Sequence, residues 1–434
     1  MTAVVVGSLA ISAGAAHAQT ELQLWHAMPS EHNHVILSVV GEFNASQREY
    51  RIVSSYKGGY PDTMNAGLAA ARAGNPPHIL QVFDVGTATM MAASRAIRPV
   101  HELMQGAGEP FEPKAYLPAI TGYYATSAGE MLSFPFNSSS MVMWLNRDAF
   151  RKAKLDPDKP PKTWPEVFDA ARKLRDSGHA TCGFSNAWGT WAHLEQFSAW
   201  HDVPLATKAN GFDGFDTELK LNGPLQVKHL TNLVELQKTK VYDYSGRTQV
   251  GEPRFTSGEC PIFLTSSGFF SSVKANAKFD WAAAPMPYYP EAPGAPQNAI
   301  IGGASLWVMG GKSVNEYKGV ARFFAFLSDT ERQARLHRMS GYLPVTRAAY
   351  EATKGSGFYE ANPSLQVPLL ELTNKEPTAN SRGYRLGNMA QLRDVWSDEI
   401  EAALAGQKSP KAALDDATAR GNELLRAFQR NVAK

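Results

Sequence analysis

The chain has 434 residues, of which 44% are hydrophobic and 19% are charged, as expected for two or three folded domains with full cores. Its 43 Lys and Arg residues outnumber its 41 Asp and Glu residues by only two, which excludes the strongly basic surface that nucleic-acid-binding proteins use. After the N-terminus no segment reaches the roughly 18 consecutive apolar residues that a membrane-spanning helix requires. We therefore expect no nucleic-acid partner and no stable membrane insertion.

The first 18 residues have the pattern of a secretory leader. Residues 2–18 contain no Lys, Arg, Asp or Glu, and Ala16-His17-Ala18 is the small-x-small pattern that signal peptidase cuts, here before Gln19. Because no Lys or Arg precedes the apolar run, we interpret residues 1–18 as a signal peptide that is complete or shortened at its start. A frayed apolar tail does not explain the Ala-His-Ala ending. We expect the mature protein to begin near Gln19 and to reside in the periplasm.

The N-terminal third alternates between strand and helix patterns. The expected strands are residues 22–25, 50–54 and 79–83, and the expected helices are residues 35–43, 62–73 and 89–95, the second of them capped by Asp62. This alternation predicts parallel strands with helices on both faces of the sheet. Ligands bind such sheets beyond the carboxyl ends of the strands, which places residues 25–26, residues 57–60 and Asp84 at the functional edge.

The alternating pattern restarts near Phe136 and again after Trp281. The further strands are expected at residues 141–145, 181–184, 260–264 and 305–309, and the further helices at residues 147–154, 164–178, 224–238, 317–327, 330–339 and from 390 onward. Thr163 and Glu166 have the spacing of a capping box, and Ser409-Pro410 is typical of the start of a helix.

Two cysteines, Cys182 and Cys260, each begin a short apolar run. In an oxidising compartment they are expected either to form one disulfide between neighbouring strands or to remain two buried thiols. A metal site is not expected from them, because no His residues stand at ligand spacing.

Signatures of catalysis are missing from the sequence. It has neither a His-Glu-x-x-His motif nor a Gly-x-Ser-x-Gly motif. The segment Gly-Gly-Lys-Ser (310–313) resembles the end of a phosphate-binding loop, but Leu306 stands where the first Gly is required. Asp156 and Asp158 lie in a Pro-rich turn without the other oxygen ligands of a calcium site. We expect no enzyme activity, no cofactor and no metal.

Polar clusters recur where the expected strands begin or end. They combine Gly or hydroxyl side chains with a neighbouring aromatic or apolar residue: Tyr-Lys-Gly-Gly-Tyr (56–60), Phe-Asn-Ser-Ser-Ser (136–140), Thr-Ser-Ser-Gly (265–268), Ile-Gly-Gly-Ala-Ser (301–305) and Gly-Tyr-Leu-Pro (341–344). Hydroxyls and Gly N–H groups donate hydrogen bonds without bulk, and aromatic rings contact CH groups. Each cluster alone is an ordinary turn, but together they favour a small-molecule cleft.

Six segments carry a resemblance to a known family. They are Tyr-Lys-Gly-Gly-Tyr (56–60), Gly-Thr-Ala-Thr-Met-Met (86–91), Pro-Phe-Asn-Ser-Ser (135–139), Pro-Pro-Lys-Thr-Trp (160–164), Gln-Asn-Ala-Ile-Ile-Gly-Gly-Ala-Ser-Leu-Trp-Val-Met (297–309) and Leu-Gly-Asn-Met (386–389). With them the chain resembles the sn-glycerol-3-phosphate-binding members of the extracellular solute-binding proteins of ABC uptake systems, a group that includes maltose-binding protein. The resemblance covers nearly all of the mature chain.

The resemblance implies an α/β, two-lobed periplasmic binding protein fold of type II. Each lobe is expected to hold a mainly parallel sheet flanked by helices, with the ligand in the interlobe cleft. Three crossings are expected near Phe136, Ala283 and Pro344. The implied division is residues 19–135 and 284–343 for the first lobe, and residues 136–283 and 344–434 for the second.

The resemblance also implies the ligand contacts. The matching positions are Tyr60 and Gly303 from the first lobe, Ser139, Ser266 and Arg393 from the second, and Tyr342, and Asp84 of the first lobe is a further expected contact. Arg393 offers a fork of N–H donors for a phosphate. Asp84 stands where the family has Glu, one methylene longer. Trp188 and Trp191 are expected either to line the cleft or to pack in the core.

The function that follows is capture of sn-glycerol-3-phosphate, of glycerophosphodiesters such as glycerophosphocholine, or of both. The ligand is expected to close two hinged lobes and to pass to the permease subunits of an ABC importer. Two alternatives are an oligosaccharide-binding protein of the same fold, which Arg393 disfavours, and a secreted glycerophosphodiester hydrolase. A third, a receptor that presents its closed lobes to a partner, is compatible with transport.

Overall fold

The computed structural model describes residues 19–28 and 30–432, so the signal peptide expected at residues 1–18 lies outside the described residues. Within these residues the strands form two sheets. The six strands of the first sheet are β1 (Thr20–His26), β2 (Tyr50–Tyr56), β3 (Ile79–Phe83), β4 (Ile97–Arg98), β5 (Phe134–Ser139) and β10 (Gly302–Met309). The four strands of the second sheet are β6 (Met141–Asn146), β7 (Phe184–Asn186), β8 (Ile262–Ser266) and β9 (Trp281–Ala284).

Helices flank both sheets. Those of the first half are α1 (Ser30–Ser46), α2 (Tyr60–Arg72), α3 (Thr87–Ala92), α4 (Val100–Ala107), α5 (Pro118–Tyr124), α6 (Arg147–Lys152), α7 (Trp164–Asp176), α8 (Phe197–Trp200), α9 (Thr207–Gly211) and α10 (Pro224–Gln237). Those of the second half are α11 (Pro253–Thr256), α12 (Phe270–Asn276), α13 (Val314–Leu327), α14 (Thr330–Ser340), α15 (Arg347–Gly355), α16 (Phe358–Ala361), α17 (Val367–Leu372), α18 (Met389–Leu404) and α19 (Pro410–Val432). No helix among the described residues is long and apolar enough to cross a bilayer.

The mixed α/β architecture with two sheets is the expected one, but the sheets are not mainly parallel. In the first sheet β1 runs parallel to β2 and β3, whereas β10 is antiparallel to β3, β4 and β5. In the second sheet β6 is antiparallel to β8 and β9, and β7 is parallel to β8. The expectation of mainly parallel sheets is therefore wrong. Its physical cause is that β5 leads to the other sheet through Ser140 and β10 returns from it through residues 285–301, so neither strand is placed by a helical crossover within one sheet.

The two passages between the sheets differ in length, and neither contains a helix. The first sheet ends at Ser139 of β5, and the second begins two residues later at Met141 of β6. The return passage runs from Ala284 of β9 to Gly302 of β10. Ser139 pairs with Gly302, so residues 136–139, which we expected at the start of the second lobe, form part of a strand of the first sheet.

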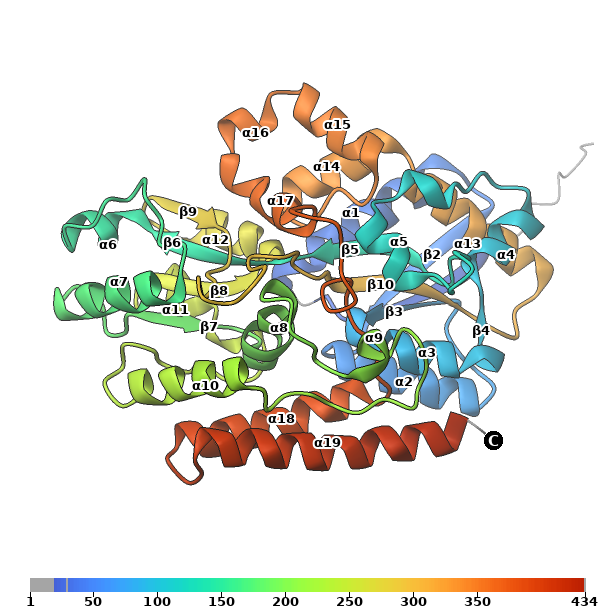
Figure 1. Cartoon of the computed structure of the whole chain (residues 1–434). Helices are drawn as coiled ribbons and strands as arrows, with labels where there is room; N and C mark the ends of the chain where they lie inside the picture. Colours follow the sequence, from blue (N-terminus) through green and yellow to red (C-terminus); the bar gives the residue numbers. More distant parts are fainter. Residues whose placement is uncertain (1–18, 29, 433–434) are drawn as a thin grey trace, which may run out of the picture.

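The C-terminal helices connect the two bodies. Figure 1 shows α18 and α19 lying along the same side of both sheets, beneath α2 and α10. Leu392 and Trp396 of α18 belong to the same buried cluster as Leu80 and Trp307 of the first sheet. Because α18 is anchored in this way, a side chain on it can reach the space between the sheets.

Local sequence signals explain most helix starts. Thr163 and Glu166 form the predicted capping box of α7, and the Ser409 hydroxyl accepts from the Ala412 N–H at the start of α19. The prediction for α2 is wrong in one respect. Gly59 is the N-cap, and Asp62 lies three residues later, where its carboxylate accepts from the Gly59 N–H at 3.0 Å.

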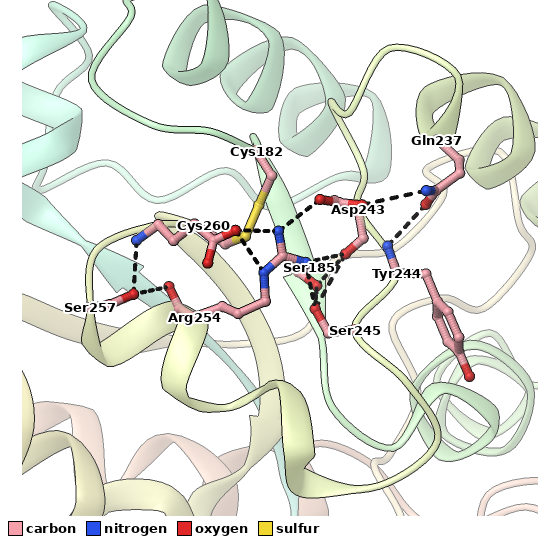
Figure 2. Close-up of polar contacts among 10 residues, drawn as sticks. Cys182, Ser185, Gln237, Asp243, Tyr244, Ser245, Arg254, Ser257 and Cys260 are labelled. Atoms are coloured by element: carbon pink, nitrogen blue, oxygen red, sulfur yellow. Dashed lines mark hydrogen bonds and ion pairs between the residues drawn. A yellow bond between two sulfur atoms is a disulfide. The ribbon is translucent and has the colours of Figure 1, made fainter.

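Of the two states expected for the cysteines, the structure shows the disulfide. Cys182 and Cys260 are bonded, with their Cα atoms 5.1 Å apart. The bond ties the segment before β7 to the segment before β8, and both sulfur-bearing side chains are buried (Figure 2).

Candidate ligand-binding site

A cavity of about 410 Å³ lies between the two sheets. Its wall includes every residue that the sequence predicted for the site: Tyr60, Asp84, Ser139, Trp188, Ser266, Gly303, Tyr342 and Arg393. Trp191 also lines it. The cavity has the size and the mixed apolar and polar lining of small-molecule sites.

Arg393 is held at the cavity wall by a buried carboxylate. Its Nε and Nη2 atoms donate to the two carboxylate oxygens of Glu195 at 2.8 and 2.7 Å. The Glu195 side chain is 0% exposed and that of Arg393 is 14% exposed, so the pair is removed from water. Burial alone lowers the pKa of Arg393, but the Glu195 carboxylate outweighs it and leaves the pKa above its ordinary value. Arg393 therefore carries a permanent charge.

Part of the Arg393 guanidinium remains free for a ligand. Among the described residues, no hydrogen bond is made by its Nη1 atom, which leaves two N–H donors on a side chain that lines the cavity. Arg393 is the fifth residue of α18 and lies beyond the first turn, so the helix dipole adds little to anion binding.

Asp84 lies beside this pair. Its Oδ2 accepts from the Tyr384 hydroxyl at 3.0 Å and lies 4.0 Å from Arg393 Nη2. Burial raises the pKa of Asp84 to about 7, the Arg393 charge opposes this shift, and the Glu195 carboxylate adds to it. Asp84 is thus a carboxyl group that gains or loses a proton near neutral pH while facing the cavity.

A chain of neutral hydrogen bonds positions Tyr60. The Ala27 N–H donates to Gln81 Oε1, Gln81 Nε2 donates to Asn137 Oδ1, and Asn137 Nδ2 donates to the Tyr60 hydroxyl. The Tyr60 ring stacks on Phe83 with 5.5 Å between ring centres and an interplanar angle of 5°. Burial raises the pKa of Tyr60 to about 12, so its O–H remains a donor at physiological pH.

Backbone geometry accounts for the glycines at the start of β10. Gly303 has a φ of +85°, and a Cβ atom there would lie 2.0 Å from the Asn137 carbonyl oxygen. A Cβ on Gly302 would lie 2.5 Å from the Trp191 ring. Only glycine fits either position, and both bring backbone to the cavity surface.

Three further hydroxyl-bearing or aromatic positions belong to the predicted set. Ser266 is the last residue of strand β8, and its Oγ accepts from the Gly268 N–H at 3.0 Å, which leaves its own proton for another acceptor. Ser139 ends β5 directly opposite Gly302. Trp188 adopts a φ of +55° and donates its backbone N–H to the Thr248 carbonyl at 3.3 Å. Trp188 and Trp191 were expected either to line the cleft or to pack in the core. Both line the cavity, although Trp191 is only 5% exposed.

Several residues that line the cavity, or that hold its lining side chains in place, were not singled out from the sequence. Glu195 was missed, although it is the only acidic residue in the aromatic segment 191–200, and such a residue in an apolar run signals a buried pair. Asn137 lies within a quoted motif, and Gln81 is a polar residue in a buried strand. Arg247 and Glu252 lie in an irregular loop where no local signal marks them. No cluster of three potential metal ligands occurs in the described part of the chain.

Residues 38–367 match the model of the bacterial extracellular solute-binding protein family. The chain belongs to this family. It is 52% identical over 412 residues to the sn-glycerol-3-phosphate-binding periplasmic protein UgpB of Rhizobium meliloti, covering 95% of each chain. It is 46% identical over 420 residues to the protein of the same name from Escherichia coli, covering 96% of this chain and 95% of that one. These relatives confirm the resemblance and the periplasmic location.

Solved structures of this family share the fold. The Mycobacterium tuberculosis UgpB in complex with glycerophosphocholine matches 94% of this chain and 99% of its own, with a TM-score of 0.77 and 19% identity. The maltose-bound T. maritima MalE3 matches 93% of this chain and 100% of its own, with a TM-score of 0.76 and 18% identity. Both likenesses confirm the two-lobed α/β architecture.

Proposed function

We propose that this protein is the periplasmic receptor of an ABC importer and that it captures sn-glycerol-3-phosphate in the cavity between the sheets. One observation carries the proposal: a buried, permanently charged guanidinium with free N–H donors lies in a cavity lined by hydroxyls. The extensive identity to proteins named for this ligand supports the same assignment.

The phosphate is expected at Arg393. Its Nη1 donors supply charge, and the hydroxyls of Ser139 and Ser266 supply further donors. Asp84 then accepts from a glycerol hydroxyl, and the Tyr60 O–H donates to an oxygen of the ligand. Since Asp is one methylene shorter than the family's Glu, a water molecule is expected to bridge Asp84 and the glycerol.

Transport requires that the ligand join both lobes. Asp84, Tyr60 and Gly303 come from the first sheet and its adjoining segments, whereas Ser266 and Trp188 come from the second sheet and its adjoining segments. A ligand that contacts both sets favours the closed form, with hinges at the passages 139–141 and 284–302. The closed form is the one that we expect the permease subunits to recognise.

Glycerophosphodiesters are a second candidate class. The cavity volume of about 410 Å³ leaves room beyond a glycerol phosphate, and Trp188 and Trp191 line its wall. Aromatic faces attract quaternary ammonium groups such as that of glycerophosphocholine. We do not expect the protein to hydrolyse either ligand, and release of choline from glycerophosphocholine would contradict this part of the proposal.

Calorimetric titration of the purified protein tests the assignment. sn-Glycerol-3-phosphate should bind with one site per chain, and glycerol and maltose, titrated as controls, should not bind. Binding of maltose without binding of the phosphate ester would instead support the oligosaccharide alternative. Native mass spectrometry of the purified protein should also detect a retained glycerophosphate ester.

A further inference from the structure

One side of the cavity is formed by an irregular segment between α10 and β8. Residues 243–259 leave the second sheet, reach the cavity and return to β8. Arg247, Thr248, Gln249 and Glu252 at the tip of this segment line the cavity. Regular structure in the tip is limited to one short turn, Gln249–Gly251, so its position depends on side-chain contacts.

Arg254 holds the two ends of this segment together. Its Nη2 atom donates to Asp243 Oδ2 at 2.7 Å and to Glu259 Oε1 at 2.6 Å, and its Nε atom donates to Glu259 Oε1 at 2.9 Å. Its Nη1 atom donates to Ser245 Oγ at 3.0 Å. Figure 2 shows the guanidinium between the Asp243–Ser245 side of the loop and the Cys260 side. One side chain thus closes the loop at its base.

The base is also attached to the second sheet. Ser185 of β7 donates to the Asp243 carbonyl at 2.5 Å, and the Cys260 N–H donates to the Arg254 carbonyl at 3.0 Å. Cys260 is joined by its disulfide to Cys182, two residues before β7 (Figure 2). The base of the loop is therefore held to the second sheet by hydrogen bonds and a disulfide, and Arg254 bonds to residues on both sides of the tip.

The tip in turn contacts the helix that carries Arg393. Arg247 donates to Glu401 Oε1 from Nε at 2.8 Å and to Asp398 Oδ1 from Nη2 at 2.8 Å. These carboxylates lie five and eight residues beyond Arg393 on α18, or about 8–12 Å along the helix axis at 1.5 Å per residue. Arg247 at the tip accordingly lies beside the part of α18 that is five to eight residues beyond Arg393.

We infer that Arg254, which does not line the cavity, is a positioning residue for ligand selection. It fixes the loop wall formed by residues 247–252, and this wall contacts the part of a ligand that extends past a glycerol phosphate. The inference rests on the proposed function for the identity of the ligands, but not for the role of Arg254 in holding the loop.

If Arg254 only stabilised the fold, its loss would lower the stability of the protein and leave the ratio of the two ligand affinities unchanged. Arg254 is 21% exposed, and its partners Asp243 and Glu259 are 15% and 38% exposed, so its loss should do little to the global fold. The chain offers a matched control in Arg147. This residue is 26% exposed, pairs with Asp158 and Asp280 in the same lobe, and does not line the cavity.

The test compares Arg254→Met, Arg254→Lys and Arg147→Met with the unmodified protein. Calorimetry should show that Arg254→Met weakens glycerophosphocholine relative to sn-glycerol-3-phosphate by about tenfold, the loss of roughly one charged hydrogen bond at the tip. Arg254→Lys should recover part of this ratio, because an ammonium cannot span all three partners. Arg147→Met should leave the ratio unchanged.

Hydrogen exchange supplies a readout that needs no ligand. In Arg254→Met the amides of residues 244–252 should exchange at least tenfold faster, while those of strands β6 and β8 keep their protection. Unchanged exchange in the loop overturns the inference whatever the ligand is. Faster exchange with an unchanged affinity ratio overturns the role in selection. If the unmodified protein binds neither ester, the proposed function fails, and the exchange data still decide whether Arg254 holds the wall.

Discussion

The cavity has an ionic end and a neutral end, and the two are built differently. At the ionic end Arg393, Glu195 and Asp84 form a cluster in which every member depends on the charge of the others. At the neutral end Tyr60 is held by uncharged groups, the amides of Asn137 and Gln81 and the hydroxyl of Tyr342. Both ends are buried, so burial does not distinguish them. They differ in the group that loses its partner when one member is removed, which is a charged group at the ionic end and an uncharged group at the neutral end.

This difference separates binding from folding. Removal of one partner from a buried ion pair leaves an uncompensated charge, which costs about 3–5 kcal/mol, whereas an unsatisfied neutral group costs about 1–3 kcal/mol. A single substitution at the ionic end therefore changes stability and affinity together. At the neutral end the two effects can be measured separately.

The largest effect is expected for Arg393→Met. Because Glu195 then keeps a buried charge without a partner, the free energy of unfolding should fall by about 3–5 kcal/mol. Binding of sn-glycerol-3-phosphate should weaken by about 2–5 kcal/mol. Denaturant titration and calorimetry measure the two quantities.

The double variant Arg393→Met with Glu195→Gln separates the effect on stability from the effect on affinity. It removes the orphaned charge, so most of the stability should return while the affinity stays low. Recovery of wild-type affinity in the double variant would show that the guanidinium does not bind the phosphate.

The second effect is a pH dependence, of about 1.4 kcal/mol per pH unit for each titrating group at most. Burial raises the pKa of Asp84 to about 7, so the folded state holds this proton more tightly than the unfolded state does. Through this group the protein loses stability as pH rises from about 4 to about 7. Burial lowers the pKa of His193 to about 3 and of His201 to about 4. Through these groups the protein gains stability as pH rises toward 6.5. The two contributions oppose each other.

The variant Asp84→Asn separates the contribution of Asp84 from that of the histidines. Denaturant titrations between pH 4.5 and 7.5 should show a steeper rise of stability with pH in this variant than in the unmodified protein, because the opposing contribution of Asp84 is removed. An identical slope in both proteins would mean that Asp84 does not hold a proton in the folded state.

Much of the site was predictable because its residues lie beside regular elements. Strand β3 was predicted to the residue, and Asp84 directly follows it. Glu195 could not be assigned as the partner of Arg393, because the two lie 198 residues apart and meet only through the packing of α18. Arg254 and the loop wall were missed for a similar reason, since irregular chain has no periodicity to read. The predicted strand directions are wrong where β5 and β10 depart from the alternation of strands and helices.

The smallest effect, at the neutral end, is the sharpest test of the comparison. Tyr60 accepts from Asn137 at 3.0 Å and also hydrogen-bonds with Tyr342, and we expect it to donate its own proton to the ligand. Tyr60→Phe keeps the stacking on Phe83 but leaves the Asn137 amide without that acceptor. Stability should fall by about 1–2 kcal/mol, and the affinity for sn-glycerol-3-phosphate should fall about tenfold, as for one lost hydrogen bond to an anionic ligand.

Tyr359→Phe is the matched control for this substitution. Tyr359 is a buried tyrosine whose hydroxyl bonds with His337 Nε2 at 2.9 Å, and it does not line the cavity. Its loss should lower the free energy of unfolding by a similar amount and leave the affinity unchanged. If both variants lose stability and neither loses affinity, Tyr60 only supports the wall, and the ligand is held by the ionic end alone.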